Sequence, residues 1–92
     1  MIGFAECECT IYDAGSLKEK RAVLKRVLTR VQNKFNVSIS EIGYQDTWQR
    51  TSFGIAAVSS SRVQTEKELQ RVLAFIDSFP EIERTITRTE WF

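Results

Sequence analysis

The stretch Ser16–Phe35, SLKEKRAVLKRVLTRVQNKF, decides how the rest of the chain is arranged. Ser16 followed three residues later by Glu19 is the pattern of a capping box, in which the hydroxyl group accepts a backbone N–H and the carboxylate reaches back to the cap. The apolar residues fall on one helical face: Leu17, Leu24, Val27, Leu28, Val31 and Phe35. The sequence therefore predicts a helix with one face packed against another element.

The outer surface of this helix is almost entirely basic. It carries six Lys and Arg residues: Lys18, Arg21, Lys25, Arg26, Arg30 and Lys34. Lys20 lies near the edge of the apolar face, so we expect it to extend to solvent or to reach a carboxylate of a neighbouring sheet. With Lys20, seven of the thirteen basic residues lie in this one helix, although the net charge of the chain is only +1.

Acidic residues should therefore lie elsewhere, and several fall in segments that we interpret as strands or strand ends: Glu6, Glu8, Glu81, Glu83 and Glu90. Such a separation of charge sets up a directional field that is suited to holding an anion. One interpretation of the basic helix is a charged face that is simply solvated. The other is a docking surface for a phosphate-rich partner, which the local excess of basic residues favours.

Length and composition predict one globular domain over residues 1–92. A hydrophobic fraction of 42%, with six Phe, two Trp and one Pro, is typical of a chain that buries a single core. No apolar run approaches the roughly twenty residues needed to cross a bilayer, and the first residues do not resemble a secretion signal. We expect a cytoplasmic protein with no membrane partner.

Two cysteines, Cys7 and Cys9, are two residues apart in a strand-like segment and so point to the same face, where they meet disulfide geometry badly. We expect buried, reduced thiols. The chain has no histidine, which removes the commonest general base and every Ser-His or Cys-His nucleophile pair. We therefore expect no metal, no cofactor and no enzymatic activity.

Four segments alternate between apolar and polar residues, as strands with one covered face do. Residues 2–12 place Ala5, Cys7, Cys9 and Ile11 on one side. The other three segments are residues 36–42, 48–59 and 82–92, with turn-like residues at 43–47.

A second helix is predicted over residues 62–79, where the apolar positions again recur at helical spacing: Val63, Leu69, Val72, Leu73 and Ile76. Phe79-Pro80 ends it, because the residue before proline avoids the helical region. Its N-terminal cap would be either Ser61 with Gln64 or Thr65 with Glu68, and the sequence leaves both open.

The order strand, helix, strand, strand, helix, strand predicts an α+β fold, the ferredoxin-like βαββαβ plait. Right-handed crossovers would place the first and third strands at the centre of a four-stranded antiparallel sheet, with both helices on one face. The uncovered face would carry Glu6 and Glu8 beside small side chains, without an aromatic platform for bases. A low-relief face of this kind, or an edge strand, would instead allow a homodimer.

The string Gln45-Asp46-Thr47-Trp48-Gln49-Arg50 is the most distinctive local feature. Trp48 with Gln49 would form an interaction loop, since Trp is a frequent anchor at contacts. Alternatively, the indole closes one end of the core while Arg50 pairs with Glu6 or Glu8 across the sheet, and we favour this second interpretation.

Three strings resemble the YlxP-like family of small bacterial proteins: Ser16-Leu17-Lys18-Glu19-Lys20-Arg21, Phe35-Asn36-Val37-Ser38, and Asp46 with Trp48-Gln49-Arg50. The resemblance extends over nearly the whole chain, although Cys7 and Cys9 stand where family members often have Leu or Val. It implies a ferredoxin-like fold and a bacterial cytoplasmic protein. Because the family's genes tend to lie beside genes for translation initiation and ribosome maturation, it also implies a ribosome-associated role, but no known reaction.

Our leading hypothesis is a non-enzymatic, ribosome-associated accessory protein that binds structured RNA, such as ribosomal RNA, through the basic helix. The predicted RNA-binding residues are Lys18, Lys20, Arg21, Lys25, Arg26, Arg30 and Arg50. The alternative is a homodimeric protein-interaction module that associates through the open sheet face or an edge strand.

Overall fold

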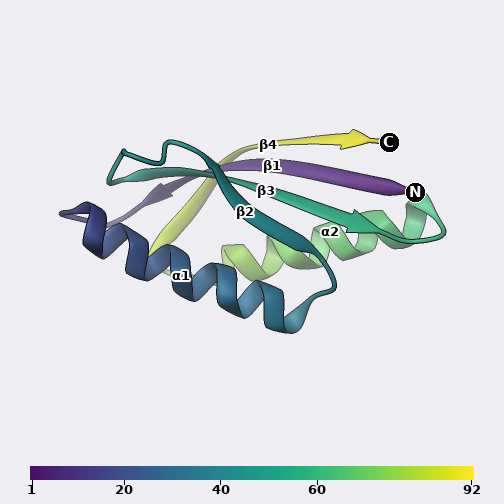
Figure 1. The fold of residues 1–92 in the computed structure, drawn as a ribbon, viewed down its shortest axis with the longest axis horizontal. Helices are drawn as coiled ribbons and strands as arrows, with labels where there is room; N and C mark the ends of the chain where they lie inside the picture. Colours follow the sequence, from purple (N-terminus) through teal and green to yellow (C-terminus); the bar gives the residue numbers. More distant parts are fainter.

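Four strands and two helices alternate along the chain in a computed structural model that describes residues 1–92. The elements are β1 (Ile2–Ile11), α1 (Leu17–Lys34), β2 (Ser38–Gly43), β3 (Arg50–Val58), α2 (Arg62–Asp77) and β4 (Ile82–Trp91). The strands form one antiparallel sheet, and both helices pack on the same face of it (Figure 1). This is the ferredoxin-like α+β plait that the sequence predicted.

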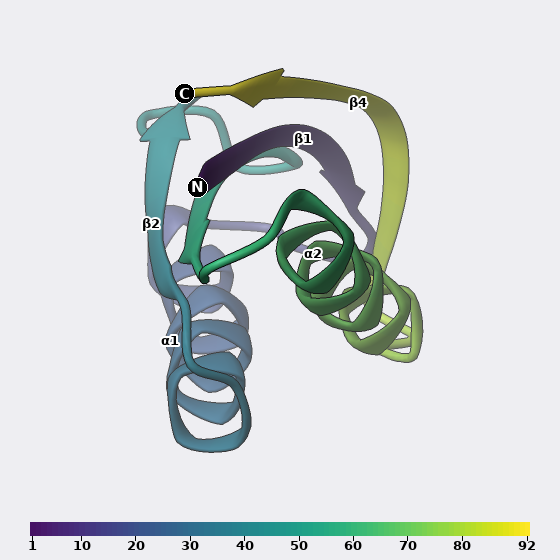
Figure 2. The same ribbon diagram turned by 90° about the vertical axis from the view of Figure 1, so that its right-hand side faces the viewer.

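The strand order in the sheet is β2-β3-β1-β4, so the first and third strands are central, as predicted. Seen from the end, α1 lies beneath the β2 side of the sheet and α2 lies beneath β1 and β4 (Figure 2). The opposite face of the sheet is covered by no element of this chain. We call it the open face.

Apolar and polar residues alternate along β1, which allows one face of the strand to pack on the helical layer. Successive side chains point to opposite faces, and Ala5, Cys7, Cys9 and Ile11 are all buried against the helices. They join a core of eighteen buried hydrophobic residues drawn from all six elements and their connections. Cys7 and Cys9 are free and buried, which confirms that part of the prediction. Contact with Cys7, together with burial, raises the pKa of the Cys9 thiol far above its ordinary range.

Both helices begin at a serine cap. Ser16 accepts the backbone N–H of Glu19 at 3.1 Å, while the Glu19 carboxylate accepts the N–H of Gly15 at 2.7 Å. In α2 the structure selects Ser61, whose hydroxyl accepts the N–H of Gln64 at 3.2 Å. Neither helix is both long enough and apolar enough to span a membrane.

Two details of the predicted elements were wrong. Val63, which was placed on the apolar face of α2, is 62% exposed, because the face of α2 that meets the sheet begins two residues later, at Thr65. The third strand begins at Arg50 rather than at Trp48. Trp48 and Gln49 belong instead to the loop between β2 and β3, residues 44–49, in which Tyr44 has a positive φ of 59°.

Candidate nucleic-acid interface

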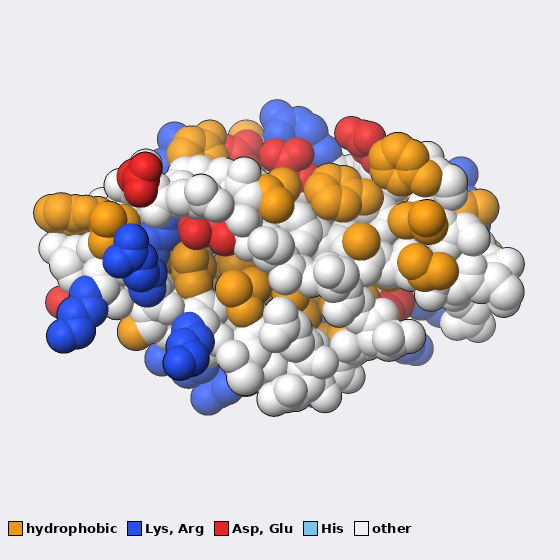
Figure 3. Space-filling view, in the orientation of Figure 1, with side chains coloured by type: hydrophobic (Ala, Val, Ile, Leu, Met, Phe, Trp, Pro, Cys, Tyr) orange, Lys and Arg blue, Asp and Glu red, His pale blue; other side chains and the backbone are white.

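The exposed basic residues of α1 form two rows rather than one uniform surface. Lys18, Arg21 and Lys25 follow each other at spacings of three and four and lie on one stripe of the helix. All three are exposed, and none lies within ion-pair distance of a carboxylate. We call them the free row. Figure 3 shows Lys and Arg side chains gathered over the N-terminal half of α1.

A second row, Arg26, Arg30 and Lys34, faces α2 and the start of β4. Its charged groups contact a carboxylate or aromatic rings of the same chain. Arg26 forms an ion pair with Glu81, the residue before β4. Four residues further on, the Arg30 guanidinium lies 5.6 Å from the centre of the Phe79 ring. Lys34 lies 5.0 Å from the centre of the Phe75 ring in α2. Arg30 and Lys34 stay exposed, whereas Arg26 is only partly exposed and already carries an opposite charge.

Lys20 is the clearest correction to the predicted RNA-binding set. Its side chain is 1% exposed, and its Nζ lies 3.0 Å from Oε2 of Glu41 and 2.5 Å from the carbonyl oxygen of Tyr44. The Thr51 hydroxyl donates to the same Glu41 oxygen at 2.7 Å. Of the two alternatives for Lys20, reaching a sheet carboxylate is therefore the correct one. An ammonium group enclosed in this way is not available to a phosphate outside the protein.

Shallow depressions flank Lys25 on both sides. One lies toward β2, has a volume of about 390 Å³ and includes Arg21, Thr29 and Glu41 in its lining. The other lies toward the second row, has a volume of about 410 Å³ and includes Ala22, Arg26 and Arg30. Because Arg21 and Lys25 stand at the rims, a phosphate group seated here would meet at least two cations, although Glu41 lowers the positive potential on the β2 side.

The loop of residues 44–49 is held to the rest of the molecule at both ends. At its start, the Tyr44 carbonyl accepts from Lys20 and also from the N–H of Thr47 at 3.0 Å. At its end, the Gln49 carbonyl accepts the N–H of Ile11 at 2.9 Å. Between these points Trp48 is 51% exposed. The favoured interpretation, in which the indole closes the core, was therefore wrong.

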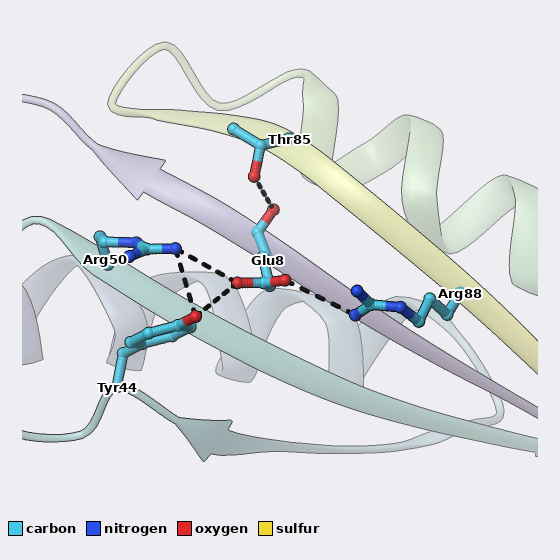
Figure 4. A network of polar contacts seen from close by, with 5 residues as sticks. All are labelled: Glu8, Tyr44, Arg50, Thr85 and Arg88. Atoms are coloured by element: carbon cyan, nitrogen blue, oxygen red, sulfur yellow. Dashed lines mark hydrogen bonds and ion pairs between the residues drawn. The ribbon is translucent and has the colours of Figure 1, made fainter.

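On the open face the Tyr44 ring and Arg50 form a network around Glu8 (Figure 4). The Tyr44 hydroxyl donates to Oε1 of Glu8 at 2.7 Å, and Nη2 of Arg50 approaches the same oxygen at 3.3 Å. Arg50 also stacks on the Tyr44 ring, 4.2 Å from its centre. Arg88 of β4 lies 3.6 Å from the other Glu8 oxygen. The predicted pairing of Arg50 across the sheet is confirmed, with Glu8 as its partner.

This network changes the predicted charge separation. Glu8 lies between two arginines on the open face, Glu41 is turned toward α1, and Glu81 is paired with the second row. The acids are thus distributed among the bases rather than gathered on the far side of the sheet. Arg50 is about half exposed but carries a local negative partner, so it contributes less to an anion site than the free row does.

Sequence reasoning missed Tyr44 and Arg88. The alternation of β4 places Arg88 on the same face as Glu6 and Glu8. The strand register sets Arg88 opposite Glu6, and its contact with Glu8 is the diagonal one. Tyr44 gave no such signal, because its role depends on a positive φ and on contacts with Lys20 and Glu8, which lie far away in the sequence. No group of three or more His, Cys, Asp or Glu side chains is arranged to hold a metal ion.

Comparison of the sequence with known proteins shows the family to which this plait belongs. Residues 2–89 match the family described as Protein of unknown function (DUF503), and the chain belongs to this family. It is 98% identical, over all 92 residues of both chains, to "Uncharacterized protein YlxP" of Bacillus subtilis (strain 168). Both findings agree with the resemblance described above.

Proposed function

We propose that this protein binds structured RNA through the free row of α1 and acts as a non-enzymatic, cytoplasmic accessory protein associated with the ribosome. One observation carries the proposal: Lys18, Arg21 and Lys25 are exposed on successive turns of one helix and have no carboxylate partner. Unpaired cations at this density are suited to a polyphosphate backbone, because each of them can neutralise a phosphate group.

The proposed site differs from the one predicted from the sequence. Lys20 is removed because it is buried, and Arg26 because it is paired with Glu81. Arg30 remains as a peripheral contact whose guanidinium is exposed above Phe79. Three to four phosphate contacts would make the logarithm of affinity fall with the logarithm of salt concentration with a slope of about −2 to −4.

The free row bears on which kind of RNA the protein would bind. The free row would read phosphate position rather than base sequence, since Lys and Arg contacts to the backbone carry no sequence information. Among structured RNAs, we favour ribosomal RNA because the family resemblance implies a role near translation and ribosome maturation. Ribosomal subunits and their precursors are therefore the first partners to test.

Charge reversal on one helix with a matched reversal on the other tests the proposal. The test variant is Arg21→Glu/Lys25→Glu in α1. The control is Lys67→Glu/Arg71→Glu, which makes the same change of net charge at exposed positions of α2. Co-sedimentation with ribosomal subunits at low salt should fall at least tenfold for the α1 variant and stay close to wild type for the control. Equal binding by all three proteins would contradict the proposal.

A second candidate function is homodimerisation through the open face. Five large hydrophobic side chains with exposed fractions above 40% lie on strands of the sheet or directly after them: Ile2, Ile42, Val58, Ile86 and Phe92. Figure 3 shows hydrophobic side chains gathered over the strands in the right half of the view. Gly54 and Ala56 lie on the same face of β3, so the open face has little relief between these side chains. A second copy related by a two-fold axis would cover this surface.

A further inference from the structure

The exposed indole of Trp48 has no function in the fold that would explain its presence. It is 51% exposed and pairs with no aromatic ring, and the arginine that stacks on a tryptophan in this protein, Arg62, lies over Trp91. The half of the Trp48 surface that stays in solvent adds nothing to the burial of apolar surface that stabilises the fold. Aromatic residues of this kind are used to bind a partner that brings a flat apolar surface.

The loop that carries Trp48 is already fixed in place. Lys20 and the N–H of Thr47 both donate to the Tyr44 carbonyl, and Ile11 donates to Gln49 at the other end. The Tyr44 side chain is bound a second time, on the open face, through Glu8 and Arg50 (Figure 4). Because the loop is already ordered, binding of a ligand to Trp48 would cost little conformational entropy.

This loop lies at the same end of the molecule as the start of α1 (Figure 1). Lys20 of α1 contacts Tyr44 directly, and the Gln49 side-chain amide reaches toward the carbonyl of Ala14 at 3.5 Å. Lys18 and Arg21 of the free row also belong to the first two turns of α1, although they project from other sides of the helix than Lys20 does. The loop that carries Trp48 and the first turns of α1, which carry Lys18 and Arg21, thus lie at the same end of the molecule.

The surroundings of Trp48 are suited to a nucleobase rather than to a phosphate. Asp46, Thr47 and Gln49 line a shallow depression with Trp48, which has a volume of about 430 Å³. The Asp46 carboxylate repels phosphate but would accept hydrogen bonds from exocyclic amino groups, and the Gln49 amide would donate or accept at a base edge. Phosphates of the same RNA would be held by Lys18 and Arg21 at this end of the molecule.

We propose that Trp48 stacks on an unpaired base of the RNA whose phosphates are bound by Lys18 and Arg21. This inference rests on the proposed RNA binding and makes it more specific: the preferred ligand is RNA with an unpaired base next to a helix, rather than a continuous duplex. Structured RNA presents such bases in loops, bulges and ends, and stacking on an aromatic side chain tolerates any base. A single stacked base typically raises affinity about tenfold.

The experiment compares two labelled RNA hairpins with equal numbers of phosphates by fluorescence anisotropy at low salt. One carries an unpaired single-stranded tail, and the other is paired up to a blunt end. Wild type should bind the tailed RNA about tenfold more tightly. Trp48→Leu should lose this preference while keeping the affinity for the blunt hairpin and the salt dependence. Trp48→Phe should keep most of the preference, since Phe also stacks.

A second measurement detects stacking directly and controls for folding. The chain has two Trp residues, so the fluorescence that is lost in Trp48→Phe isolates Trp48 from Trp91. Binding of the tailed RNA should quench that component. Far-UV circular dichroism of each variant checks the fold, and Trp48 is exposed enough that its replacement should not disturb it.

Each outcome separates the two proposals. If wild type binds both hairpins with equal affinity, or if Trp48→Leu keeps the wild-type preference for the tailed hairpin, base stacking is wrong while RNA binding through α1 stands. If wild type binds neither hairpin at low salt, the proposed function itself is wrong. If Trp48→Leu instead abolishes self-association seen by light scattering, Trp48 is an anchor for a second copy, and the base-stacking inference is overturned.

Discussion

At the scale of the residue, the ammonium group of Lys20 connects three parts of the chain. It belongs to α1, pairs with Glu41 of β2 and donates to Tyr44 at the start of the β2–β3 loop. A buried charge is costly to desolvate, and the ion pair and the second hydrogen bond together offset this cost. Removing one member leaves the other groups buried without a partner.

We therefore expect Lys20→Met to lower the free energy of unfolding by about 3 kcal/mol, at the lower end of the usual range because Glu41 keeps some contact with solvent. Urea denaturation measures this loss. Lys18→Met is the matched control, since Lys18 is exposed in the same turn of α1 and should change stability by less than about 0.5 kcal/mol. Equal stability of the two variants would mean that the enclosed ion pair contributes nothing.

The hydroxyl group of Tyr44 should report the network around Glu8 through its titration. The hydrogen bond to Glu8 raises the pKa of Tyr44 above its ordinary value of 10.0. Because the pKa is higher in the folded than in the unfolded state, the stabilisation is complete below about pH 10 and is lost as the pH rises through the folded pKa.

Tyr12→Phe leaves Tyr44 as the only tyrosine, so tyrosinate absorbance follows this group alone. We expect a midpoint above 10 that moves down when Glu8→Gln is added, because the neutral amide is a weaker acceptor for the hydroxyl proton. A midpoint that does not move would show that the contact between Tyr44 and Glu8 is absent in solution.

At the scale of the element, β1 packs closely on α2 at Gly3. A Cβ atom at this position would lie 2.7 Å from Cγ2 of Thr65 and 2.9 Å from atoms of Leu69 and Trp91. The crowding comes from three sides at once, so no single side chain can move away to relieve it. The approach of α2 to the sheet therefore depends on the absence of a side chain at Gly3.

Gly3→Ala should lower the free energy of unfolding by about 1–3 kcal/mol, the usual cost of overpacking. Gly15→Ala is the control, because a Cβ there would meet only a Glu19 carboxylate oxygen at 3.4 Å. Thermal or urea unfolding of both variants decides the comparison. If Gly3→Ala were as stable as Gly15→Ala, α2 would lie further from β1 in solution than it does in this structure.

Helix α1 also shows how one element divides its charges between two tasks. Its second row meets Phe75 of α2 and Phe79 and Glu81 of the connection to β4, whereas the free row has no ion pair and no cation–π contact within the chain. The division follows from helix geometry, since residues three and four apart share a stripe and each stripe faces a different neighbour.

At the scale of the whole molecule, the free row of α1 and the open face of the sheet would bind different partners. The radius of gyration is 12.9 Å, so the two surfaces lie close enough that one partner could interfere with the other. RNA binding should depend steeply on salt, and association through hydrophobic side chains should not. Salt dependence therefore distinguishes the leading function from the second candidate.

Light scattering at high micromolar concentration tests the dimer with two matched valines. Val58 lies on the open face and Val63 on α2, and they are 65% and 62% exposed. If the open face joins two copies, Val58→Glu should yield a monomer while Val63→Glu leaves the dimer intact, because a charge buried at an interface is unfavourable. A wild-type monomer at this concentration would remove the second candidate.

The sequence by itself determined the order of the elements, the serine cap of α1 and the arrangement of the sheet with both helices on one face. These features follow from local periodicity, capping chemistry and the handedness of crossovers, all of which act over short stretches of chain. It also placed Cys7 and Cys9 in the core and Arg50 beside an acid across the sheet.

Only the tertiary structure decided which basic residues of α1 remain available to a partner. Lys20 is enclosed by Glu41 and Tyr44, and Arg26 is paired with Glu81, and all of these partners lie at least twenty residues away in the sequence. The exposure of Trp48 was decided in the same way, by the contacts that hold its loop. Helical spacing predicts the face of the helix on which a charged side chain lies. Whether that side chain is paired depends on the residues that the tertiary fold places beside it.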